Sequence, residues 1–79
     1  MKASTLRDIM VANNITNNDL TAIIDKSPRQ IASYLSGAQP IPRAEALIMR
    51  AIDERVVDLD WVLDRVVIEI KESKEEERQ

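Results

Sequence analysis

The chain has 79 residues, of which 44% are hydrophobic and 32% are charged, and its formal net charge is −3. This composition is typical of one small globular domain rather than of a disordered tail. The sequence contains no Cys and no His, which excludes thiol nucleophiles, disulfides, zinc-finger sites and imidazole bases. No apolar run approaches the roughly 20 residues of a membrane span, and the N-terminus lacks a secretory signal, so we expect a cytoplasmic protein.

Charge is distributed unevenly along the chain. Residues 1–50 carry six Lys and Arg against four Asp and Glu, a net charge of +2, whereas residues 51–79 carry five against ten, a net charge of −5. Such an asymmetry is the pattern expected if one end of the protein meets an anionic surface and the other end faces away from it.

Helical periodicity predicts a first helix over residues 3–13 and a second helix over residues 17–24. The second helix has a well-formed start, because Thr16 can cap it and Asp19 occupies the third position of a capping box. In the first helix, the residues predicted to face inward are Leu6, Ile9 and Met10, with Val11 as a further candidate.

A third helix is predicted over residues 28–36. Ser27 is a favourable N-cap, Pro28 suits the first helical position, and Gln30 can complete a capping box. Gly37 is a natural terminator, because glycine readily adopts the left-handed conformation that ends many helices. The residues spaced to face the core are Ile31, Tyr34 and Leu35.

A fourth helix is predicted over residues 42–54, and a fifth begins at Leu59 after a possible cap at Asp58. Residues 66–70 are rich in β-branched side chains and could form a strand, but no Gly or Pro interrupts the pattern, so helix is preferred. Residues 71–79 are highly charged and are predicted to fray. In the fourth helix, the residues predicted to face inward are Leu47, Ile48, Ala51 and Ile52.

The most informative feature is the pair of short helices in residues 16–37. A tight turn between them would fix the second as a rigid rod, and a helix of ~10–12 Å diameter fits the ~12 Å major groove of B-DNA. The segment resembles the helix-turn-helix of the lambda-repressor-like family, which includes phage repressors, Cro proteins and the xenobiotic-response-element group of bacterial regulators. The residues that carry this resemblance are Leu20, Ile24, Ser27, Ile31, Tyr34 and Gly37, with Pro42-Arg43 and residues 60–63 further along.

The resemblance implies an all-α fold: a five-helix lambda-repressor-like DNA-binding domain with an extended C-terminal helix. Residues 1–57 would form the helix-turn-helix domain, and residues 58–79 a C-terminal helix that serves in dimerisation and ends in a charged, fraying tail. The sequence departs from the family pattern at Asp25, where Gly is usual, and at Lys26, where an apolar residue is usual. Asp tolerates the left-handed conformation better than most residues, so we expect the turn to survive.

The start of the third helix holds the candidate base-contacting residues, Arg29, Gln30 and Ser33. Arg can pair bidentately with guanine and Gln with adenine, and the family resemblance places base contacts at these positions. The alternatives are that Gln30 only closes its capping box, that Arg29 is a solvated surface charge and that Ser33 is inert.

Phosphate contacts are expected at the starts of the second and fourth helices and around the third. Ile41 has no side-chain acceptor, so the first amides of the fourth helix are available to a phosphate or to water. Tyr34 is also a core candidate whose hydroxyl could reach a phosphate. The candidate phosphate-binding residues are Thr16, Asn17, Asn18, Ser27, Tyr34, Gln39 and Arg43.

The C-terminal segment is the predicted dimerisation element. Val66 and Ile70 lie too far along the fifth helix to reach the core of the same chain, whereas Trp61 and Leu63 are expected to cover that core. A symmetric dimer would double the DNA contacts and place half-sites about one helical turn apart. The predicted dimerisation residues are Val62, Val66 and Ile70.

These patterns predict a sequence-specific DNA-binding transcriptional regulator, a dimeric repressor of phage or bacterial type that binds a palindromic operator in the cytoplasm of a bacterial host. The alternative is a protein-interaction module, such as an antitoxin-like partner that neutralises another protein. No catalytic site, cofactor, metal or small-molecule ligand is predicted. A domain of this length has little room for a shielded pocket, and Asp58, Asp60 and Asp64 lie on a helix rather than on a calcium loop.

Overall fold

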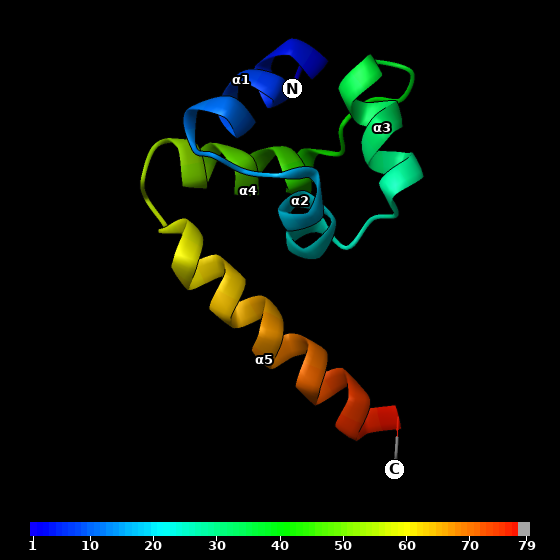
Figure 1. The fold of residues 1–79 in the computed structure, drawn as a ribbon, viewed down its shortest axis with the longest axis vertical. Coiled ribbons are helices and arrows are strands. Elements are labelled where there is room, and N and C mark those ends of the chain that lie inside the picture. The colour runs from blue at the N-terminus through cyan, green and yellow to red at the C-terminus, as the bar shows by residue number, and fades with distance from the viewer. Residues whose placement is uncertain (78–79) are drawn as a thin grey trace.

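The computed structural model describes residues 1–77, and this part of the chain forms helices and no strand. α1 packs against α3 and α4, and α2 packs against α3 and α5. In Figure 1, α1 to α4 surround a common centre, and α5 extends away from them. The predicted all-α architecture is therefore confirmed, as are the predicted spans of the second and third helices. The five helices are α1 (Ala3–Ala12), α2 (Asn17–Ile24), α3 (Pro28–Ser36), α4 (Arg43–Asp53) and α5 (Leu59–Glu77).

Local backbone signals set the boundaries of the two central helices as predicted. Thr16 Oγ1 accepts from the Asp19 amide and Asp19 Oδ2 accepts from the Thr16 amide, each at 3.1 Å, which completes the capping box. Asp25 ends α2 in the left-handed conformation (φ 53°), and Gly37 ends α3 in the same way (φ 82°). The turn between α2 and α3 therefore forms without a glycine.

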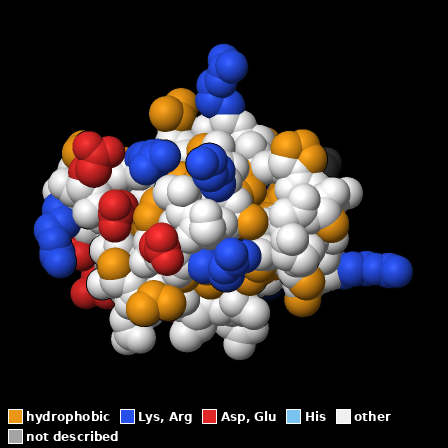
Figure 2. Space-filling view, turned by 90° about the horizontal axis from the view of Figure 1, so that it is seen from above, with side chains coloured by type: hydrophobic (Ala, Val, Ile, Leu, Met, Phe, Trp, Pro, Cys, Tyr) orange, Lys and Arg blue, Asp and Glu red, His pale blue; other side chains and the backbone are white. Residues whose placement is uncertain are grey.

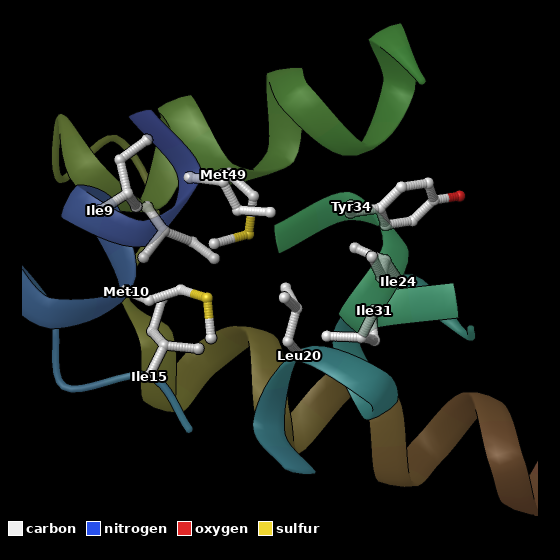
Figure 3. Packing of buried hydrophobic residues seen from close by; sticks show 10 residues of the cluster. Ile9, Met10, Ile15, Leu20, Ile24, Ile31, Tyr34 and Met49 are labelled. Atoms are coloured by element: carbon white, nitrogen blue, oxygen red, sulfur yellow. The ribbon is translucent and has the colours of Figure 1, made fainter. Parts of the chain in front are cut away.

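The core lies where α1, α2, α3 and α4 meet (Figure 3). Leu20 is fully buried at its centre, and Leu6, Ile31 and Met49 are each 1% exposed. Burial of one such side chain contributes about 1.5–3 kcal/mol to folding. The full cluster comprises Leu6, Ile9, Met10, Ile15, Leu20, Ile24, Ile31, Tyr34, Met49 and Ile52.

The predicted inner face of α4 is correct at Ile52 and wrong at Leu47 and Ile48. Met49 and Ile52 are buried, whereas Leu47 and Ile48 are 62% and 45% exposed. The helix is strongly amphipathic, but the core uses only part of the apolar face that its periodicity indicates. Packing against α1 selects the Met49 face and leaves Ile48 at the surface.

Two further apolar residues lie outside the core, contrary to prediction. Val11 is 83% exposed, because the inner face of α1 is already filled by its neighbours. Trp61 is 50% exposed, whereas Leu59 and Val62 are the residues of α5 that pack against the core. The start of α5 is therefore rotated relative to the prediction, and its largest side chain faces solvent.

Helix α5 is continuous through residues 66–70, which resolves the choice between helix and strand in favour of helix. The described part of α5 is helical up to Glu77, and Glu and Lys are good helix formers. Residues 78–79 of the predicted tail lie outside the described residues. Within residues 1–77, every helix is too short or too polar to cross a membrane.

Candidate nucleic-acid interface

The first turn of α3 is fixed by its own sequence and lies at the surface. Ser27 Oγ accepts a hydrogen bond from the Gln30 amide at 3.2 Å, and Pro28 occupies the first helical position. Ser27, Pro28 and Arg29 are all exposed. A capped and exposed helix end of this kind can approach a partner without local rearrangement.

Five of the predicted DNA-contacting residues line one shallow, open hollow at this end of α3. They come from the cap, from the first turn, from the second turn and from the loop that follows the helix. The loop returns to the helix because the Gln39 amide donates to the Ser33 carbonyl at 3.2 Å. The structure therefore brings together residues that the sequence separates by up to 12 positions. The lining residues are Ser27, Arg29, Gln30, Ser33 and Gln39.

The three predicted base-contacting side chains differ in their availability. Arg29 is exposed and makes no ion pair within residues 1–77. Gln30 is partly buried, and the described hydrogen bonds include none from its amide group to the Ser27 backbone, so the predicted capping box is only half formed. The Ser33 hydroxyl donates to the Arg29 carbonyl at 3.2 Å and keeps only its acceptor capacity for a ligand.

The start of α2 presents a second group of polar side chains. Thr16, Asn17 and Asn18 are exposed. The Thr16 hydroxyl is engaged in the capping box, so its remaining capacity is small, whereas Asn17 and Asn18 direct exposed amide groups from the first turn. The capping box already occupies the Asp19 amide, and the Asp19 carboxylate in the same turn opposes an anion there.

The start of α4 is a third candidate phosphate site. α4 begins at Arg43, with Pro42 at the N-cap. The Pro42 side chain makes no capping hydrogen bond to the first amides of the helix. Arg43 is exposed beside these free amides. Glu45 in the same turn lies 3.9 Å from Lys26 Nζ, and this pairing offsets part of its negative charge. The pair also links the α2–α3 turn to α4.

Tyr34 does not belong to this surface. Its side chain is 2% exposed and forms part of the core, and in Figure 3 only its hydroxyl points away from the labelled cluster. Because a phosphate needs an accessible donor, we do not retain Tyr34 among the candidate contacts.

One positioning contact has no signal in the sequence. Arg7 of α1 donates to the Leu35 carbonyl near the end of α3. The two residues are 28 positions apart, so neither periodicity nor a motif could have joined them. This bond ties the far end of α3 to α1, while the Lys26–Glu45 pair secures its leading end.

The surface seen from the top of Figure 1, where α3 has its C-terminal end, carries both basic and acidic side chains. Figure 2 shows this end, with Lys and Arg side chains projecting from its middle and from its edges. The Asp and Glu side chains visible there gather to the left of centre, whereas α3 lies to the right in Figure 1.

The three predicted dimerisation residues lie on one surface. Val62, Val66 and Ile70 occur together along one wall of a groove between α5 and the rest of the molecule. Val62 also packs against the core, Val66 is partly buried, and Ile70 is 50% exposed. The predicted stripe therefore exists as a continuous surface of the folded chain.

Comparison of the chain with family models, with curated proteins and with solved structures finds no match. The likeness of residues 16–37 to the lambda-repressor-like family is therefore a prediction from the sequence alone. Function has to be inferred from the chemistry of the two exposed surfaces, the leading end of α3 and the α5 groove.

Proposed function

We propose that the protein is a sequence-specific DNA-binding transcriptional regulator, a repressor of phage or bacterial type with a lambda-repressor-like fold. The observation that carries this proposal is the convergence of exposed polar side chains at the capped, leading end of α3. This end enters the major groove, where the base edges display distinguishable hydrogen-bonding patterns.

Two side chains contact base edges in this scheme. Arg29 pairs with the O6 and N7 atoms of a guanine, and Gln30 pairs with the N6 and N7 atoms of an adenine. Gln30 is available for this role because the Ser27 cap uses its backbone amide and not its side chain. Each such pair provides about 1–3 kcal/mol of discrimination against the wrong base.

The starts of α2 and α4 hold the flanking phosphates. Asn17 and Asn18 donate from α2, and the uncapped amides of α4 act together with Arg43. These contacts fix the orientation of the duplex but carry no sequence information.

The protein acts as a symmetric dimer. Residues 1–50 contain only six basic residues, so one copy can neutralise only a few phosphates and its affinity falls steeply with salt. Two copies double the contacts and recognise a palindromic site with half-sites about one DNA turn apart.

Selection from a pool of random duplexes at low salt tests the proposal. The wild-type chain should enrich a common palindromic sequence, and the double variant Arg29→Ala/Gln30→Ala should bind without enriching it, because its phosphate contacts remain. Arg50→Ala is the matched control, since it removes an exposed arginine from α4 and should preserve the selection. Absence of enrichment by the wild-type chain contradicts the proposal.

A protein-interaction module, such as an antitoxin-like neutralising partner, is the second candidate. The net charge of −3 and the apolar groove beside α5 favour it. A chain that ignores duplex DNA at low salt but co-purifies from its host in a stoichiometric complex with another protein would support this candidate and exclude the first.

A further inference from the structure

A long groove separates α5 from the body of the molecule. Its volume is about 670 Å³, and its lining is largely apolar. Val62, Val66 and Ile70 line it from α5, and Ile23 and Ile48 line it from α2 and α4. Three helices therefore bound the groove, and no side chain of the described residues fills it.

Large apolar side chains remain in contact with water along this groove. Trp61 and Ile70 are each 50% exposed, and Ile48 is 45% exposed. Helix α5 is about 28 Å long, because its 19 residues rise 1.5 Å each, and the residues by which it packs on the core are Leu59 and Val62, in its first turn. A contiguous exposed apolar surface of this kind marks an interaction site.

The charges along α5 show which partner fits. Arg65 and Glu69 lie two residues on either side of Val67, and Asp60 and Lys74 lie seven residues on either side of it. Within residues 1–76 none of these four makes an ion pair, and the Arg65 guanidinium lies over the Trp61 ring, 4.7 Å from its centroid. Two antiparallel copies of α5 centred on Val67 place each Arg65 near the partner's Glu69 and each Lys74 near the partner's Asp60. Two parallel copies set the Arg65–Glu69 side of one helix against the Asp60–Lys74 side of the other, where opposite charges are offset by five residues, about 7.5 Å along the axis.

The same antiparallel register also fits the apolar residues together. Val62, Val66 and Ile70 are spaced by four residues. Two of the partner's three residues fall midway between them, and the third lies two residues beyond Ile70. Side chains from the two helices therefore alternate at intervals of about 3 Å along the shared axis. Charge and apolar spacing, which are independent features of the sequence, thus select one arrangement.

We propose that the groove receives α5 of a second copy of this chain, with the two α5 helices antiparallel about a twofold axis near Val67. The interface is isologous, because each copy offers both the groove and the helix that fills it. This inference rests on the proposed function, which gives the dimer its role in DNA binding. Self-association itself can be measured without DNA.

Charge reversal tests the pairing in the full chain. Arg65→Glu and Glu69→Arg each convert both residue 65–residue 69 pairs of the dimer into like-charge pairs. The dissociation constant of the dimer, measured by sedimentation, should therefore rise more than about tenfold for each variant. An equimolar mixture of the two variants restores both attractive pairs and should form a heterodimer close to wild-type affinity. Circular dichroism of each variant verifies that its helices remain intact.

Disulfide trapping tests the orientation, since the natural chain has no Cys. Val66→Cys should oxidise to a linked dimer, because the two copies of residue 66 lie beside the axis. Ser73→Cys should not, because the antiparallel arrangement separates its copies by about 18 Å. Cross-linking of Ser73→Cys, charge variants that associate like wild type, or a wild-type chain that stays monomeric would each overturn the proposal. A dimer that selects no DNA sequence would contradict the proposed function alone.

Discussion

The leading end of α3 and the groove face of α5 both project from the same core, yet they expose opposite chemistry. The α3 end is polar, is fixed by the Ser27 cap and presents Arg29 to solvent. The α5 face is apolar, is anchored through Leu59 and Val62 in its first turn and exposes Trp61. A hydrated polyanion suits the first surface and a protein surface suits the second. This difference underlies the two separate binding tasks that we propose, one for each surface.

The largest expected effect comes from breaking the core that supports both regions. Leu20→Ala should lower the free energy of unfolding by about 2–5 kcal/mol, because it leaves a cavity at a fully buried position. Chemical denaturation measures this change. Val56→Ala is the control, since that side chain is 77% exposed and its loss should cost less than about 0.5 kcal/mol. Equal effects of the two substitutions would contradict the described core.

The next effect separates base recognition from helix capping at the α3 end. Gln30→Ala should remove about 1–3 kcal/mol of discrimination at one A·T pair of the selected site and leave thermal unfolding unchanged. The Ser27 cap bonds to the backbone amide, which alanine retains. Titration of matched and substituted duplexes measures the discrimination. A loss of stability with unaltered base preference would instead assign Gln30 to the cap.

At the start of α2, one of two adjacent residues should affect folding stability and the other should affect DNA binding. Thr16→Ala should cost about 1 kcal/mol of folding stability, because it removes the acceptor for the Asp19 amide. Asn17→Ala should leave stability nearly unchanged and weaken binding to all duplexes by a similar factor. Denaturation and anisotropy titrations on both variants measure the two effects. The interpretation fails if Asn17→Ala changes the sequence preference.

The smallest effect concerns the acidic residue in the turn before α3. Asp25→Asn should strengthen DNA binding by roughly twofold at low salt, because it removes a negative charge near the proposed interface. Asn also tolerates the left-handed conformation observed at Asp25, so folding should be unaffected. Titrations at low and high salt provide the test. A gain that persists undiminished at high salt would not be electrostatic.

Local chemistry could be predicted from the sequence where a residue acts on its own backbone neighbours. The Thr16–Asp19 capping box and the left-handed residues Asp25 and Gly37 are all in the predicted places. These features depend on side-chain acceptors and backbone sterics within a few residues, so no tertiary information is needed.

Prediction failed where the apolar face of a helix is not the face that packs against the core. In α4, the choice between Ile48 and Met49 depends on how α1 lies against the helix, and that is a tertiary property. For the same reason, the sequence wrongly predicts that Trp61 covers the core. The hydrogen bond from Arg7 to the Leu35 carbonyl could not be predicted at all, because it joins distant segments without a sequence pattern.

Base discrimination by Arg29 tests the central claim most directly. Affinities of wild type, Arg29→Ala and the control Arg50→Ala are measured on the selected duplex and on duplexes with each guanine replaced. We predict that wild type and Arg50→Ala prefer one guanine by about 1–3 kcal/mol and that Arg29→Ala loses this preference at that position only. Full retention of the preference by Arg29→Ala would contradict the placement of α3 in the major groove.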